Sequence, residues 1–127
     1  MYYINKTVDY SFEEAEEKIR EALKNVGFGI LTEIDFQATM KAKLDKDTPK
    51  YKILGACNPN FAYEAFQAEE KIGIMLPCNV TVIENKAGGT DVSIIDPMEA
   101  FKVVGNDEIA PFAEEVKKVL EGVLLSI

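Results

Sequence analysis

Apolar residues recur every three or four positions in two long segments of the chain, and this period predicts helices packed along one side. The first segment follows Ser11, which forms a capping box with Glu14, and stops at Gly27, a residue suited to the positive φ of a helix end. The second begins near Pro111 and keeps the period to the end of the chain. The first stripe consists of Phe12, Ala15, Ile19, Ala22, Leu23 and Val26. The second consists of Ile109, Phe112, Ala113, Val116, Val119, Leu120, Val123 and Leu124.

Five other segments are rich in β-branched, aromatic and alternating apolar residues, which is typical of strands. They cover residues 3–10, 28–34, 51–57, 71–84 and 90–96. Residues 71–84 are predicted as one long strand with a bend at Pro77, which cannot donate to a ladder. The basis is a set of apolar residues of one parity, which extended backbone would place on one face: Ile72, Ile74, Leu76, Cys78, Val80 and Val82.

Two shorter helices complete the prediction. One covers residues 35–45, and the other follows Asn58 and Pro59, which suit the N-cap and the first helical position. The later strands form a hairpin, and the long helices lie near the two ends of the chain. This order predicts an α+β fold: a single, largely antiparallel sheet with helices packed on one face. No linker or repeat interrupts the 127 residues, so residues 1–127 form a single domain.

Composition narrows the classes of function. The chain has 14 basic and 22 acidic residues, a formal charge of −8, and Arg20 as its only arginine. This balance argues against nucleic acid and anionic membranes as partners, because phosphate neutralisation needs basic side chains. The chain has no histidine, which removes histidine-based catalytic triads and imidazole metal sites. It also shows no glycine-rich phosphate loop and no nucleotide fingerprint, so we expect no cofactor.

The same features predict a small soluble protein of the cytoplasm. Residues 1–10 alternate like a strand and do not resemble a signal peptide. No apolar run approaches the length of a membrane helix. In that compartment Cys57 and Cys78 would remain thiols.

The two cysteines are the most suggestive chemical feature of the sequence. Cys57 ends a predicted strand directly before the helix capped by Asn58, whose N-terminal N–H groups would stabilise a thiolate and lower its pKa. Cys78 follows Pro77 on the predicted core side of its strand. The sulfurs would meet if the two strands were antiparallel neighbours, and would lie far apart if the strands were parallel or separated by another strand.

Three roles are open for these cysteines. Both occupy apolar parity positions, so they can be buried structural residues. They can form a redox pair, with Cys57 as the thiolate and Cys78 as its resolving partner. They can also hold a soft metal such as Cu(I), with Met75 or Met98 as a further ligand. A zinc site would lack the histidines that usually complete it, and we predict no metal site of that kind.

The Cys57-Asn58-Pro59 and Leu76-Pro77-Cys78 motifs resemble those of a known family, the bacterial and archaeal domain of unknown function family 302. The resemblance implies a compact α+β fold with a curved antiparallel sheet, a homodimer, and no established activity. Its marked residues would be Cys57, Asn58, Pro59, Pro77 and Cys78. The segments that carry it are Gly27-Phe28-Gly29, Cys57-Asn58-Pro59, residues 72–78, Val80-Thr81-Val82 and Asp96-Pro97-Met98.

Two functional hypotheses follow. The first is a non-enzymatic module that binds a small ligand or a partner and acts as a homodimer, because no nucleophile with a neighbouring base is evident. The alternative is a thiol-based redox or soft-metal-binding protein that uses Cys57 and Cys78. Enzymatic activity is left open, and the sequence favours its absence. The surplus of apolar residues near the C-terminus predicts a dimer contact there, formed by Leu120, Val123, Leu124, Leu125 and Ile127.

Overall fold

The computed structural model of the chain describes residues 1–127 and contains one open, twisted sheet of five strands. The strand order is β1-β5-β4-β3-β2, and every neighbouring pair is antiparallel. The α+β class predicted from the sequence is therefore confirmed. The strands are β1 (Tyr3–Val8), β2 (Gly29–Asp35), β3 (Tyr51–Cys57), β4 (Cys78–Glu84) and β5 (Thr90–Ile95).

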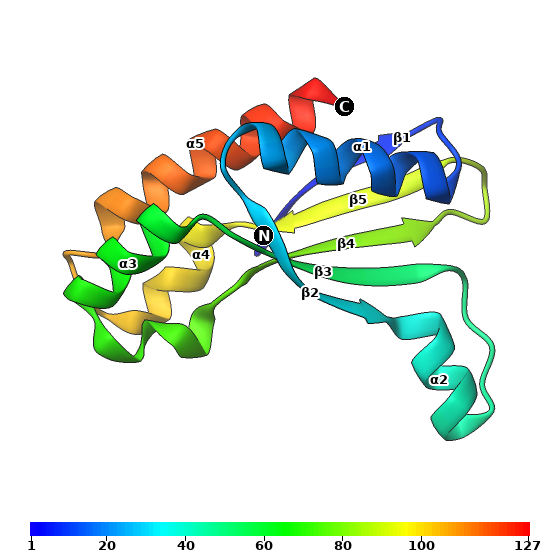
Figure 1. Cartoon of the computed structure of the whole chain (residues 1–127), viewed down its shortest axis with the longest axis horizontal. Coiled ribbons are helices and arrows are strands. Elements are labelled where there is room, and N and C mark those ends of the chain that lie inside the picture. The colour runs from blue at the N-terminus through cyan, green and yellow to red at the C-terminus, as the bar shows by residue number, and fades with distance from the viewer.

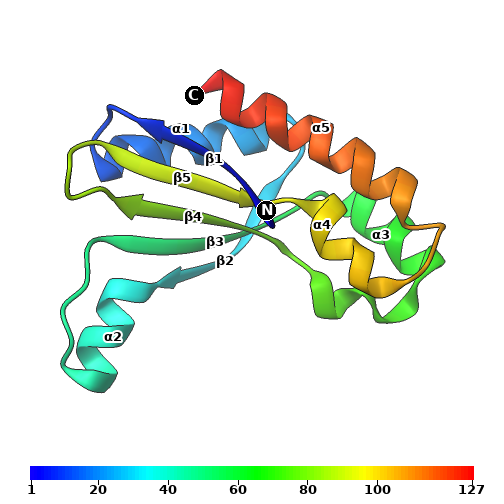
Figure 2. The same ribbon diagram turned by 180° about the vertical axis from the view of Figure 1, so that it is seen from behind.

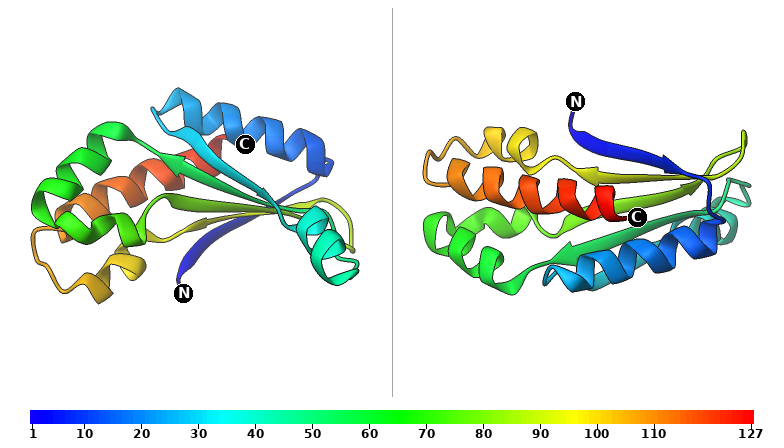
Figure 3. Two further views of the ribbon diagram at one scale, coloured as in Figure 1. Left: turned by 60° about the horizontal axis from the view of Figure 1, so that its bottom comes forward. Right: turned by 90° about the horizontal axis from the view of Figure 1, so that it is seen from above.

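Helices α1 and α5 lie side by side over one face of this sheet (Figure 1). Seen from behind, the strands are in front and α1 lies beyond them, so the other face carries no such layer (Figure 2). Helix α2 projects at one end of the molecule, and α3 and α4 gather at the opposite end (Figure 3). The helices are α1 (Phe12–Asn25), α2 (Phe36–Leu44), α3 (Pro59–Ala68), α4 (Pro97–Phe101) and α5 (Ala110–Ser126). Two short 3₁₀ helices are η1 (Glu70–Met75) and η2 (Lys102–Val104). No helix is both long enough and apolar enough to span a bilayer.

The main hydrophobic core lies between the sheet and the helices α1 and α5. It contains 17 buried residues, to which both predicted helix stripes contribute. Leu54, Val82 and Ile94 are completely buried beneath the helices. A second cluster of five buried residues fills the end built from α3, η1, α4 and α5: Ala65, Ile72, Phe101, Ile109 and Ala113.

The caps predicted for the long helices are present. The Ser11 hydroxyl accepts a hydrogen bond from the Glu14 N–H at 3.2 Å, and Gly27 has a φ of +84° just after α1. Helix α5 begins at Ala110, with Pro111 in the first turn, where no N–H is needed.

The prediction of one strand over residues 71–84 is wrong in its first half. Residues 70–75 form the 3₁₀ helix η1, and β4 begins only at Cys78. The shared parity breaks down because Ile72 is buried in the second cluster while Ile74 is 84% exposed. The second half alternates as expected, since Val80 and Val82 are buried and the residues between them are not.

The dimer contact predicted near the C-terminus is also largely wrong. Leu120, Val123 and Leu124 are buried within the core of the same chain. Only Leu125 remains widely exposed among the large residues of that stripe. Helix α5 has more apolar residues than a single stripe requires, because it packs against α1, α3, α4 and β1.

Asp96 has a structural role that joins two helices. Its Oδ1 accepts hydrogen bonds from the N–H groups of Met98 and Glu99 and so caps α4, a helix the sequence analysis did not predict. Its Oδ2 lies 2.9 Å from the ammonium of Lys117 on α5. Burial pushes the pKa of Asp96 upward, but the ammonium and the two N–H groups outweigh it, and the pKa lies below its usual value.

Asp96→Ala is expected to lower the free energy of unfolding at neutral pH by about 2 kcal/mol, because the N–H groups of Met98 and Glu99 and the Lys117 ammonium lose their acceptor. Asp96→Asn keeps a cap acceptor and should cost less. Since the folded pKa lies below the unfolded value, the stabilisation is complete above the usual aspartate pKa of 3.8 and is lost as the pH falls through the folded value. Urea denaturation at neutral and acidic pH checks this. A loss that grows towards acidic pH would contradict it.

Candidate functional site

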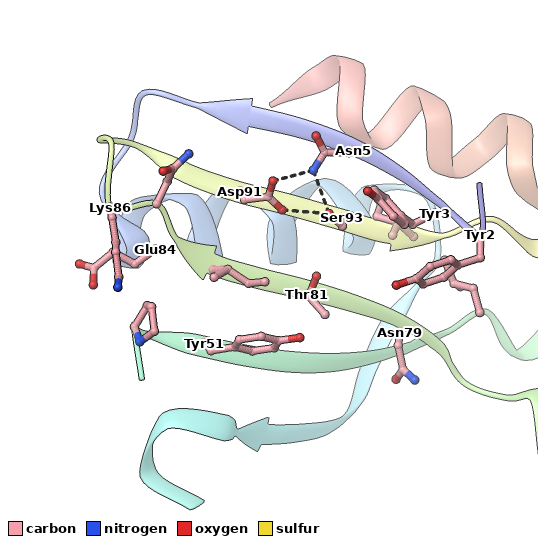
Figure 4. A pocket seen from close by; sticks show the side chains of 15 residues that line it. Tyr2, Tyr3, Asn5, Tyr51, Asn79, Thr81, Glu84, Lys86, Asp91 and Ser93 are labelled. Atoms are coloured by element: carbon pink, nitrogen blue, oxygen red, sulfur yellow. Dashed lines mark hydrogen bonds between the residues drawn. The ribbon is translucent and has the colours of Figure 1, made fainter. Parts of the chain in front are cut away.

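A broad groove lies on the sheet face that the helices leave open, and its volume is about 860 Å³. The alternation of the strands explains its lining. Val92 and Ile94 of β5 point into the core, so Asp91 and Ser93 point to the open face. The same rule places Thr81 there from β4. Figure 4 shows these side chains together with those of β1 and β3.

Three polar side chains on the β1–β5 side of the groove form a closed hydrogen-bonded triangle (Figure 4). The Asn5 amide donates to Asp91 Oδ2 at 2.8 Å and to Ser93 Oγ at 2.9 Å. The Ser93 hydroxyl donates to Asp91 Oδ1 at 2.9 Å. Asn5 reaches these partners because β1 pairs with β5 and places Asn5 directly opposite Ser93. We call these three residues the polar triad.

Aromatic side chains also line the groove. Tyr2 and Tyr3 lie at the β1 end, with their rings edge to face at a centroid distance of 5.0 Å. Tyr51 approaches from β3, and its ring is steadied by Phe36 at 4.7 Å. The groove therefore offers ring faces and hydroxyl groups in addition to the polar triad.

The two cysteines lie at a different place, in a small apolar pocket between α3, α5 and the ends of β3 and β4. Strands β3 and β4 are antiparallel neighbours, Ala56 stands opposite Cys78, and both cysteines line this one pocket. The sequence left open whether the two strands are antiparallel neighbours, and the structure shows that they are. The free volume of the pocket is only about 30 Å³, enough for a water molecule or two. Its aromatic walls are Phe28, Phe61 and Phe112.

The expected activation of Cys57 is wrong. Burial raises the pKa of the Cys57 thiol, and burial, aided by the neighbouring Cys57, raises that of Cys78 to about 11. The N–H groups at the start of α3 are not directed to a thiolate, because Asn58 Oδ1 accepts from Asn60 and Phe61 at 3.0 and 3.4 Å.

The other marked residues have visible structural functions. Asn58 caps α3, and Pro59 is its first residue. Pro77 covers Gly55 on the open face of β3, where a side chain on residue 55 would meet the proline ring. No group of three or more His, Cys, Asp or Glu side chains is arranged to hold a metal ion.

Comparison with known proteins assigns the chain to a family. The model of the family described as domain of unknown function DUF302 matches residues 4–127. The chain belongs to the DUF302 family. No curated protein matches it. A crystal structure of an uncharacterised conserved DUF302 protein from Bacillus stearothermophilus is similar, with a TM-score of 0.93 and 24% sequence identity over 99% of this chain and 98% of that one. At this identity the likeness shows the fold.

The polar triad of this DUF302 chain was missed by the sequence analysis. The available signal is the alternation of β5, in which the apolar Val92 and Ile94 point inward and Asp91 and Ser93 point outward. Asn5 lies 86 residues before Asp91, and only the pairing of β1 with β5 brings them together.

Alkylation with iodoacetamide is expected to be slower at both cysteines of the folded protein than at free cysteine. A pKa of about 11 instead of 9.0 leaves about a hundredfold less thiolate on Cys78 at neutral pH. Mass spectrometry of Cys57→Ser and Cys78→Ser variants would report each rate separately. In urea both rates should approach that of the free amino acid. Faster labelling of Cys57 in the folded protein would contradict the raised pKa.

Proposed function

We propose that this chain is a non-enzymatic binding module that holds a small ligand in the open-face groove. The observation that carries the proposal is the size of the groove together with its convergent polar triad. About 860 Å³ lies within the range of ordinary ligand sites. The cysteine pocket, at about 30 Å³, would have to open before it could take a ligand.

The chemistry of the groove favours binding over catalysis. Ser93 is bonded to a carboxylate and an amide, with no imidazole to accept its proton. Satisfied hydrogen bonds hold the three side chains in place and suit them to orient a ligand.

A two-dimensional NMR titration of the ¹⁵N-labelled protein tests the proposal. The probes are a hexose, a nucleoside, a linear diamine and a dicarboxylate, each at millimolar concentration. We expect at least one probe to shift the backbone amides of β1, β4 and β5 that border the groove. Thr81→Tyr, which fills the centre of the groove, should abolish the shifts. Glu115→Tyr adds the same side chain to an exposed site on α5 and should leave them unchanged. Shifts confined to the cysteine pocket, or no shifts with any probe, would contradict the proposal.

We further propose that the module acts as a homodimer. Support comes from edge strand β2, on which Leu31 is 67% and Ile34 is 48% exposed, since a second copy would cover such side chains. Light scattering should give twice the 14.1 kDa mass of the chain. The double variant Leu31→Lys, Ile34→Lys should give the monomer mass. A monomeric wild-type protein would contradict this part of the proposal.

A thiol-based role is the second candidate, supported by the position of Cys57 and Cys78 in one pocket on neighbouring strands. Two thiolates can bind Cu(I), a soft ion. An anaerobic Cu(I) titration against a chromogenic chelator tests this role. Stoichiometric binding that is lost in Cys57→Ser would support it, and binding unaffected by that change would remove it.

A further inference from the structure

The polar triad uses all its hydrogen-bond donors internally. The Asn5 amide has two N–H groups, and they are directed to Asp91 Oδ2 and Ser93 Oγ, with a longer contact of 3.4 Å to the Val92 carbonyl. The single O–H of Ser93 is directed to Asp91 Oδ1. No donor of the triad is left for a ligand.

The groups that remain free are acceptors. Asn5 Oδ1 has no partner within the triad, because the amide nitrogen makes all the contacts of that side chain. Each oxygen of the Asp91 carboxylate accepts one hydrogen bond and has capacity for another. A ligand at the triad must therefore donate hydrogen bonds.

The charge of the groove points in the same direction. Its lining contains two carboxylates, Glu84 and Asp91, and one ammonium, Lys86, which gives a formal charge of −1. Lys86 is exposed in the turn between β4 and β5, while Asp91 lies within β5. No arginine lines the groove. An anionic ligand would be repelled by the Asp91 carboxylate and would find no arginine to bind it. A cationic ligand could pair directly with that carboxylate.

The neighbouring rings suit a cation as well. Tyr3 lies on β1 with Asn5, Tyr51 lines the same groove from β3 on the far side of β4, and the faces of tyrosine rings attract ammonium groups. A neutral polyol would donate to the same acceptors but would gain neither this attraction nor the interaction with the carboxylate charge.

We propose that the ligand of the groove is a small organic cation with a protonated amine, whose N–H groups donate to the Asp91 carboxylate and to Asn5 Oδ1. The inference rests on the proposed function and specifies the ligand class for the same site.

Three probes of similar length and different end groups test the ligand class: 1,4-diaminobutane, 1,4-butanediol and succinate. In the NMR titration, the diamine should shift the amides of Asn5, Asp91 and Ser93 at millimolar concentration. The diol and succinate should not. Added salt should weaken the binding of the diamine, because the interaction is between opposite charges.

Asp91→Asn should weaken the binding of the diamine by about tenfold or more, the loss expected for one charged hydrogen-bond partner. Asp107→Asn is the matched control, since it removes an exposed carboxylate outside the groove and changes the net charge equally. Asn5→Ala removes the second acceptor at an exposed position and should also weaken binding. The spectra themselves report whether each variant is folded.

The remaining outcomes separate the inference from the proposed function. If the diol or succinate binds in the groove and the diamine does not, the ligand class is wrong and the binding function stands. If Asp91→Asn and Asp107→Asn weaken binding equally, the cation only follows the net charge and the inference fails. If none of the three probes shifts the groove amides, the inference fails, and the hexose and nucleoside titrations decide the proposed function.

Discussion

Gly89→Ala is expected to lower the free energy of unfolding by about 3 kcal/mol. Gly89 has a φ of +78°, a conformation that costs an alanine about 1–2 kcal/mol. A Cβ at this position would also collide with the backbone carbonyl of Val8, the last residue of β1. A carbonyl of the main chain cannot turn away as a flexible side chain can, so the strand pairing beside it must be disturbed. Urea denaturation measures the loss.

Gly88→Ala is the matched control in the same turn. Gly88 also has a positive φ, +108°, but a Cβ there has no neighbour within 4 Å. It should show the conformational cost without the collision and therefore a smaller loss. Equal losses in the two variants would mean that the contact with Val8 is not responsible.

Gly55→Ala is expected to lower the free energy of unfolding by about 2–3 kcal/mol, because the new methyl group has no space. Gly55 is buried within β3, and a Cβ would collide with the hydroxyl of Thr32 and lie 2.6 Å from the Pro77 ring. Both neighbours cross the open face of the sheet at this position, and only a residue without a side chain lets them do so.

A second change separates the two collisions. Thr32→Ala removes the nearer obstacle, so Gly55→Ala should cost less in a Thr32→Ala background, with the proline contact accounting for what remains. Gly122→Ala is the control, since it lies in α5 with no neighbour near its Cβ and should raise stability by about 0.5–1 kcal/mol. Identical costs of Gly55→Ala in both backgrounds would remove Thr32 from the explanation.

Much of the fold could be predicted from the sequence where local signals agree. The bounds of β3 were predicted as 51–57 and are correct, because the cap Asn58 ends the strand where the next helix begins. The prediction failed at residues 71–77, where alternating apolar residues occur in a 3₁₀ helix. Alternating apolar residues indicate a strand only if all of them face the same core. Here Ile72 packs against α3 and α5 residues, and Ile74 faces solvent.

The candidate site was less accessible to prediction for a different reason. Cysteines attract attention because of their chemistry, but the burial of Cys57 also depends on Phe112 and Val116 of α5, which are far along the chain. The set of residues that line the groove depends on the register between strands that are far apart in the sequence. The sequence indicates that Ser93 points outward, while nothing local indicates that Asn5 stands opposite it.

The pairing of the first strand with the last has a consequence for synthesis on the ribosome. Tyr3 pairs with Ile95, so β1 cannot join the sheet until three quarters of the chain has left the exit tunnel. Until then β1 has no partner strand, and Asn5 lacks both of its triad partners, Asp91 and Ser93. The groove should therefore form abruptly once β5 has emerged, rather than in stages as each strand emerges.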